Sequence, residues 1–293
     1  MYTLNRTIKN TQWVHLNGTQ YPVLIDGSGS IPCLSLGIGT LTQRTMSEYF
    51  KKLCTIYATD SYWLKDNPLA DASKLTMQKF VDDTTILIAA LKLEKPVILA
   101  HSGFGMAALE LAKQKKDLLR GIIMIAATPC WNTQMIEQTN ALFDKVASSD
   151  RKANDLKRKE HFAKIRKPRE SELSLNTYES CSARYWGNYN VSREFLEKLW
   201  AGIEPDDAIC DQFWGVVLPS YNLAKDIDKV SIPVILLAGH LDFDSMPLEL
   251  WKTYPKPPNF TIVDCGQVGH WPQLESPELF DDGIDKWVRK EKL

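Results

Sequence analysis

The sequence predicts an α/β fold: a mostly parallel central sheet flanked by helices, with an inserted helical cap. Short, fully apolar segments such as PVILA (96–100) and GIIMIAA (121–127) alternate with segments of helical periodicity. This alternation is typical of a parallel sheet that is covered by helices on both faces. The apolar segments are too short for membrane spans, and they have the length of strands in a buried sheet.

The alternation is interrupted once, which predicts the domain organisation. It stops near Pro129 and resumes at IPVILLAGH (232–240), and the intervening residues are rich in charged and aromatic side chains. We therefore expect residues 1–128 and 227–293 to form one core and residues 129–226 to form a helical cap, or lid, inserted between its two parts.

The individual elements are assigned from periodicity and from turn and cap residues. Asn17-Gly18 is a two-residue turn signal and predicts a hairpin. Thr76 is a candidate N-cap for an amphipathic helix. Strands are expected within residues 13–29, 31–37, 54–60, 96–100, 121–127, 232–240 and 259–266. Helices of the core are expected within residues 38–50, 76–92, 105–116 and 276–290.

Composition excludes several classes of function. The chain has 293 residues, a hydrophobic content of 44% and a formal net charge of −1, so we expect no nucleic-acid partner. The charged run at 151–169 mixes both signs and is interpreted as a solvated helix face. The six scattered cysteines and the polar N-terminus, which lacks a signal-peptide pattern, predict a cytoplasmic protein without membrane attachment. The sequence does not predict an oligomeric state.

The segment AHSGFG (100–105) places Ser102 between a predicted strand and a predicted helix. A serine on such a sharp turn protrudes at the carboxyl end of the sheet, and the next backbone N–H points toward the substrate oxygen. The usual pattern has glycine two residues after the serine, whereas Phe104 stands there. An ordinary loop serine is the alternative interpretation of this segment.

Partners for a nucleophilic serine follow in the expected order. Asp242 comes just after the strand 232–240, and His270 comes just after the strand 259–266. A histidine that activates the serine and a carboxylate that orients the histidine complete a catalytic triad. Asp244 is the alternative carboxylate. A metal site built on His240 and these two aspartates is a further interpretation, which lacks a second ligand cluster, and we expect no metal.

The chain resembles the α/β-hydrolase fold superfamily, and in particular its capped serine hydrolases. The resemblance is carried by AHSGFG, by PVILLAGHLDFDSMP and by VGHWPQLESPELF. It implies that Ser102 is the nucleophile, His270 the general base and acid, and Asp242 the orienting carboxylate, with no cofactor. It also implies that the Gly103 N–H is one oxyanion donor. The second donor is expected from LGIGT, with Gly39 preferred and Ile38 or Thr40 as alternatives.

The expected substrate is a small molecule, because a cap that covers the site excludes polymers. Candidate substrate-binding residues are Trp186, Tyr189, Phe104 and Glu179. We expect a serine hydrolase that cleaves an ester, an amide or a related acyl bond. The alternatives are a proline-iminopeptidase-like aminopeptidase with Glu179 at the substrate amine, a C–C bond hydrolase or lyase with the same triad, and a non-catalytic ligand receptor.

Overall fold

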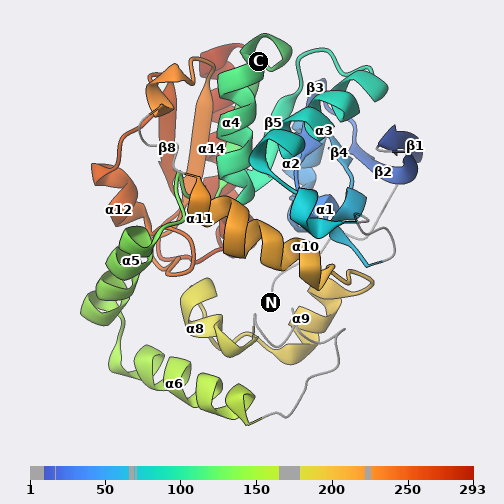
Figure 1. Cartoon of the computed structure of the whole chain (residues 1–293). Helices are drawn as coiled ribbons and strands as arrows, with labels where there is room; N and C mark the ends of the chain where they lie inside the picture. Colours follow the sequence, from blue (N-terminus) through green and yellow to red (C-terminus); the bar gives the residue numbers. More distant parts are fainter. Residues whose placement is uncertain (1–9, 17, 66–68, 70, 165–178, 222–225) are drawn as a thin grey trace.

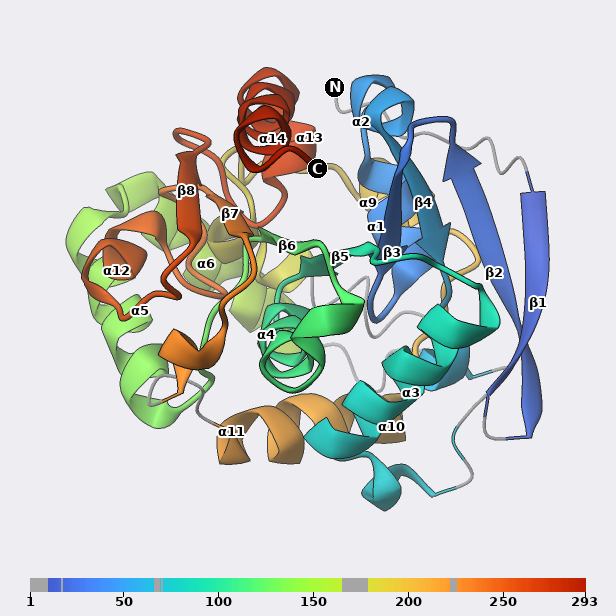
Figure 2. The ribbon, with the colours of Figure 1, turned by 90° about the horizontal axis from the view of Figure 1, so that it is seen from above.

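A computed structural model describes residues 10–16, 18–65, 69, 71–164, 179–221 and 226–293. The strands form one sheet in the order β1-β2-β4-β3-β5-β6-β7-β8 (Figure 2). β1 pairs with β2, and β2 with β4, in antiparallel fashion, while the other neighbours pair in parallel. The predicted fold class is therefore confirmed. The strands are β1 (Asn10–Leu16), β2 (Thr19–Gly27), β3 (Ile31–Ser35), β4 (Cys54–Ala58), β5 (Val97–His101), β6 (Gly121–Ile125), β7 (Val234–Ala238) and β8 (Phe260–Asp264).

The strands at the centre of the sheet are apolar because both of their faces are covered. Every residue of β5, β6 and β7 is buried. β1 and β2 form the expected hairpin at one edge of the sheet. Gly18 of its turn has φ = +80°, and Asn17 lies outside the described residues.

Helices of the core cover the two faces of the sheet, with α2, α13 and α14 on one face and α3 and α4 on the other (Figure 2). Thr76 caps α3 as expected, because its side chain accepts a hydrogen bond from the Lys79 N–H. The helix expected within residues 38–50 is divided in two, since Ser47 caps a new helix by accepting from the Phe50 N–H. The core helices are α1 (Gly39–Thr45), α2 (Glu48–Leu53), α3 (Met77–Ala90), α4 (Phe104–Lys115), α12 (Leu248–Thr253), α13 (Pro272–Glu275) and α14 (Pro277–Glu291), with short 3₁₀ turns η1 (Ser61–Trp63), η2 (Ala72–Lys74), η3 (Lys116–Leu118) and η7 (Ile227–Lys229).

A helical region within residues 133–220 is inserted between β6 and β7 (Figure 1). The exact boundaries at 129 and 226 stay predictions. The Arg44 side chain on α1 donates to the carbonyl oxygens of Leu199 and Ala201 and so ties the end of α9 to the core. The inserted helices are α5 (Thr133–Val146), α6 (Ser149–Ala163), α8 (Ser182–Tyr185), α9 (Arg193–Trp200), α10 (Asp207–Gln212), the π-helical turn η5 (Phe213–Val217) and α11 (Leu218–Ser220).

The charged run at 151–169 is only partly a solvated face. Arg151 and Asp155 on α6 are buried, at 5% and 6% exposure. Arg151 donates to the carbonyl oxygens of Ala183 and Trp186, at 2.7 and 2.8 Å, so its guanidinium holds the α8 segment in place. Residues 165–169 lie outside the described residues. No helix in the described ranges combines the length and the apolarity that crossing a bilayer requires.

Candidate active site

Ser102 occupies a strained turn between β5 and α4. Its φ is +59°, a left-handed conformation that is unfavourable for residues other than glycine. The Ser102 N–H donates to the Ile125 carbonyl oxygen at 2.9 Å, which fixes the turn to the end of β6. Such strain persists only where the surroundings enforce it, and it is concentrated at functional sites. Ser102 lines a cavity of about 310 Å³ beneath the cap.

Phe104 does not disturb this turn, which we call the elbow. Its ring points away from Ser102 and packs in an aromatic cluster. The ring centroid lies 4.9 Å from that of Trp63 and 5.1 Å from that of Phe213. Gly37 provides the space, since a Cβ there would come within 2.3 Å of the Phe104 ring. Phe104 also lines the cavity, and its role in substrate binding stays a prediction.

His270 and Asp242 form a buried pair. His270 Nδ1 lies 3.1 Å from both carboxylate oxygens of Asp242, and the two residues are 1% and 0% exposed. The backbone N–H groups of Asp244 and Ser245 each donate to Asp242 Oδ1 at 3.2 Å, which fixes the carboxylate. Burial disfavours the imidazolium, but the nearby carboxylates, above all Asp242, outweigh it and raise the pKa of His270.

Ser102 approaches this pair through Ser245. The two hydroxyl oxygens are 3.5 Å apart, and the backbone N–H of Ser245, not its hydroxyl, donates to Asp242. No hydrogen bond joins the Ser102 hydroxyl to the His270 ring in the described structure. In enzymes without a bound substrate, catalytic hydrogen bonds are often long and tighten only in the complex.

Asp244 lies at the other nitrogen of the His270 ring. Its Oδ2 is 3.9 Å from Nε2, so it does not orient the ring through Nδ1 as Asp242 does. This geometry favours Asp242 as the orienting carboxylate. Burial raises the pKa of Asp244 to about 6, although His270 and a hydrogen bond from Tyr185 favour its ionised form.

His101 packs against the segment that contains His270. Its Nε2 is 2.7 Å from the His270 carbonyl oxygen, and its ring stacks on Trp271 with centroids 4.3 Å apart. Burial, together with the neighbouring His270, lowers the pKa of His101 well below its ordinary value. This side chain is therefore a neutral structural element that also lines the cavity.

The structure changes the expected source of the second oxyanion donor. The N–H groups of Gly39 and Thr40 both donate to Asp60, the latter at 2.9 Å, so neither faces the cavity. Gly39 was the preferred donor, and this expectation is wrong for that reason. Within the described residues the N–H groups of Ile38 and Gly103 donate to no protein acceptor, and both residues line the cavity.

Three expected substrate-binding residues lie away from the cavity. Trp186 is fully buried and stacks on Trp271, at 6.0 Å between centroids. Tyr189 packs under the Arg151 guanidinium, 4.7 Å from its ring centroid. Glu179 accepts a hydrogen bond from Arg193 Nη1 at 3.0 Å. These expectations fail because each side chain holds the cap together.

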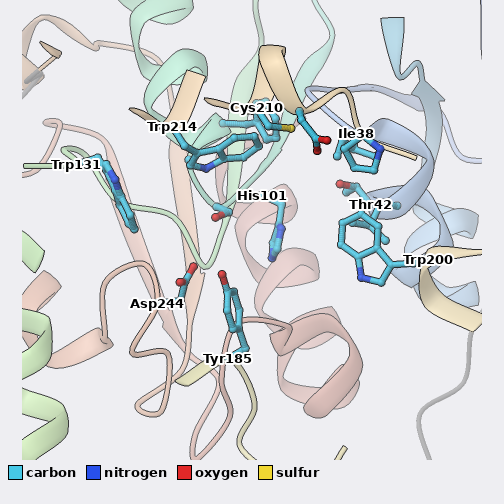
Figure 3. A pocket seen from close by; sticks show the side chains of 15 residues that line it. Ile38, Thr42, His101, Trp131, Tyr185, Trp200, Cys210, Trp214 and Asp244 are labelled. Carbon is cyan, nitrogen blue, oxygen red and sulfur yellow. The ribbon is translucent and has the colours of Figure 1, made fainter. Parts of the chain in front are cut away.

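The cavity is lined by residues of the core, of the cap, and of the loop after β7 that contains Asp242 and Asp244. Figure 3 shows Trp214 on one side of the cavity, with Tyr185 and Asp244 on the opposite side. Sequence reasoning did not select most of these residues, because an aromatic side chain in a cap carries no signal of which way it points. The lining residues are Ile38, Leu41, Thr42, His101, Ser102, Gly103, Phe104, Trp131, Tyr185, Trp200, Pro205, Asp207, Cys210, Trp214 and Asp244.

The cap and the histidine loop are joined directly by hydrogen bonds. The His270 N–H donates to the Tyr185 carbonyl oxygen at 2.6 Å. The Glu275 carboxylate accepts from the N–H groups of Gly187 and Gly269, at 2.7 and 2.9 Å. The α8 segment therefore helps to position His270.

His240 does not join the two aspartates of its loop. Its ring lies between Glu249 on α12 and Asp264 at the end of β8, with Nε2 3.0 Å from the Asp264 carboxylate. Across the described ranges no three His, Cys, Asp or Glu side chains meet in an arrangement that could hold a metal ion.

Comparisons with known proteins agree with this architecture. No family model matches the chain. The AB hydrolase superfamily protein YclE of Bacillus subtilis (strain 168) is 25% identical over 94% of this chain and 97% of its own length. A thermophilic esterase from Thermogutta terrifontis superposes with a TM-score of 0.69 at 19% identity, covering 97% of this chain and 100% of that one. Proline iminopeptidase from Mycobacterium smegmatis gives 0.67 at 17% identity, covering 96% and 98%.

The parallel sheet, the strained elbow after β5 and these likenesses together define the class. The chain has the fold of the α/β-hydrolase superfamily, as the sequence resemblance implies. Because enzymes with different substrates share this fold, the reaction has to be argued from the site itself.

Proposed function

We propose that the protein is a serine hydrolase that cleaves a small ester, amide or related acyl compound through an acyl-enzyme. The observation that carries the proposal is the strained Ser102 turn at a cavity beneath the cap, next to the buried His270–Asp242 pair. A cavity of about 310 Å³ suits a small acyl compound rather than a polymer.

In the proposed reaction His270 removes the Ser102 proton while Ser102 Oγ attacks the carbonyl carbon. Asp242, fixed at Nδ1, holds the ring in the required tautomer and stabilises the imidazolium. The free N–H groups of Gly103 and Ile38 receive the oxyanion. The imidazolium then protonates the leaving group, and water, deprotonated by the same ring, releases the acid from Ser102.

An esterase-like activity is preferred to the aminopeptidase alternative. The acidic residue expected to hold a substrate amine, Glu179, is engaged by Arg193 and Arg158 inside the cap. The C–C bond hydrolase and the receptor remain candidates that activity has to separate, because one site can serve several reactions on this fold.

Covalent labelling with a fluorophosphonate probe tests the proposal. We expect the wild-type protein to be labelled at Ser102 and the Ser102→Ala variant not to be labelled. Hydrolysis of 4-nitrophenyl acetate should fall by about 10⁶-fold in both Ser102→Ala and His270→Ala, because triad members act as a unit. An unlabelled wild-type protein that keeps its fold would instead support a receptor.

A further inference from the structure

The cavity beside Ser102 is both acidic and aromatic. Among the described residues that line it, Asp207 and Asp244 are the side chains that carry a full charge, and no lysine or arginine is present. His101 also lines the cavity, but burial keeps its ring neutral. The aromatic side chains of the lining are Phe104, Trp131, Tyr185, Trp200 and Trp214.

The two carboxylates differ in their surroundings. Asp207 is half exposed, and Lys65 Nζ lies 3.9 Å away and offsets its charge. Asp244 is 26% exposed and accepts a hydrogen bond from Tyr185. The basic groups that act on Asp244 are His270, whose Nε2 lies 3.9 Å away, and Arg184. The guanidinium of Arg184 is shared, because its Nε donates to Asp155 at 3.3 Å and its Nη1 donates to Asn140 at 2.8 Å. A cation in the cavity would therefore compete with the His270 imidazolium for the Asp244 carboxylate.

Trp131, Tyr185 and Asp244 all line the cavity, and Figure 3 shows Tyr185 next to Asp244 and Trp131 at the flank of the cavity. We propose that these three residues, the acidic aromatic subsite, bind an ammonium group of the substrate. The favoured substrates are esters or thioesters that carry a protonated or quaternary amine. A carboxylate supplies the charge, and the faces of Trp and Tyr attract cations through their quadrupoles. The assignment of a substrate class rests on the proposed hydrolase function of Ser102.

A bound ammonium group also affects the catalytic base. Asp244 is one of the carboxylates that raise the pKa of His270, and a protonated His270 cannot accept the Ser102 proton. A cation paired with Asp244 offsets this influence and favours the neutral imidazole. Cationic substrates therefore promote their own cleavage, whereas neutral substrates of the same shape do not.

Choline and 3,3-dimethyl-1-butanol form a matched pair that tests the subsite, because they have the same shape and differ in charge. Binding is measured by calorimetry or by quenching of tryptophan fluorescence. We expect choline to bind the wild-type protein about tenfold more tightly, the scale of a cation on aromatic faces beside a carboxylate. Asp244→Asn should reduce the ratio of the two affinities to near unity. Asp207→Asn, at the half-exposed carboxylate, should retain most of the preference for choline.

A measurement without any variant guards against a folding defect in Asp244→Asn. In the wild-type protein the choline preference should decline as the pH falls below about 6, where Asp244 becomes protonated. Equal binding of the two compounds, or a preference that survives both Asp244→Asn and low pH, would overturn the subsite.

Turnover of acetylthiocholine against 3,3-dimethylbutyl thioacetate extends the test to catalysis. We expect a higher kcat/KM for the cationic thioester in the wild-type protein and a smaller difference in Asp244→Asn. Fluorophosphonate labelling is run in parallel. A labelled protein without cation preference contradicts only the subsite, whereas an unlabelled protein that prefers choline contradicts only the hydrolase function.

Discussion

The Asp244 carboxylate lies 3.9 Å from Nε2 of His270, the ring nitrogen that receives the serine proton in the proposed reaction. A second carboxylate at this place stabilises the imidazolium when no substrate is bound. This relationship connects substrate charge to the pH range of activity, and it gives the first prediction.

Asp244→Asn should move the acidic limb of the pH profile of kcat/KM to lower pH. His270 acts as a base only when neutral, and removal of the Asp244 charge lowers the pKa of His270. The charged or titratable groups that face Asp244 are His270, Asp242, Tyr185, Arg184 and Cys181. The profile is measured with 4-nitrophenyl acetate. An acidic limb that stays in place or moves to higher pH would contradict the inference that Asp244 raises the pKa of His270.

Asp242→Asn should lower kcat by about 10⁴-fold, the scale of losing the carboxylate that fixes the histidine tautomer. The variant keeps the shape of the side chain, so the loop that contains Ser245 should stay folded. Circular dichroism and fluorophosphonate labelling kinetics check this expectation. A loss in Asp244→Asn that exceeds the loss in Asp242→Asn would exchange the roles of the two residues.

Phe104→Ala should destabilise the protein by about 3–5 kcal/mol, the usual cost of removing a buried phenylalanine. The ring fills the space between the elbow and the cap residues Phe213 and Trp214. Urea unfolding followed by circular dichroism measures the change in the free energy of unfolding. The matched control is Phe162→Ala on α6, which should cost less than about 1 kcal/mol because this side chain is only partly buried. Similar costs at both positions would contradict the packing role.

His240 should contribute pH-dependent stability. Burial opposes its charge, but Glu249 and Asp264 outweigh burial and raise its pKa above 6.5. The stabilisation is therefore fully present below pH 6.5 and is lost as the pH rises through the folded-state pKa. The difference in Tm between wild type and His240→Gln should be about 1–2 °C at pH 6 and smaller at pH 8.5. A difference that grows with pH would contradict this sign.

The fold could be predicted because its central elements are local and strongly patterned. β5, β6 and β7 are continuous apolar runs because both faces of the sheet are covered, and this pattern is visible without coordinates. The positions of Ser102, Asp242 and His270 follow from the same pattern, since each comes just after a strand. Their roles in catalysis stay predictions until activity is measured.

The cap residues could not be assigned in this way, because their roles depend on long-range contacts. The sequence suggests Trp186 and Glu179 as ligand-binding residues. In the structure, however, Trp186 stacks on Trp271 and Glu179 forms an ion pair with Arg193. The preference for Gly39 as an oxyanion donor is wrong, since nothing in the sequence near Gly39 indicates that Asp60 accepts its N–H. The sequence leaves Asp244 as an alternative to Asp242, because its position at Nε2 rather than at Nδ1 of His270 depends on the folded structure alone.

The hydrogen bonds between the α8 segment and the histidine loop have a consequence for engineering. Lid exchange between relatives is an obvious route to new specificity, yet here Gly187 and Tyr185 share bonds with Glu275 and His270. A transplanted lid that lacks this short backbone stretch would leave the His270 imidazole poorly aligned, even with Ser102, Asp242 and His270 all present. An exchange should therefore transfer the inserted helical region together with the loop that contains His270 and Glu275.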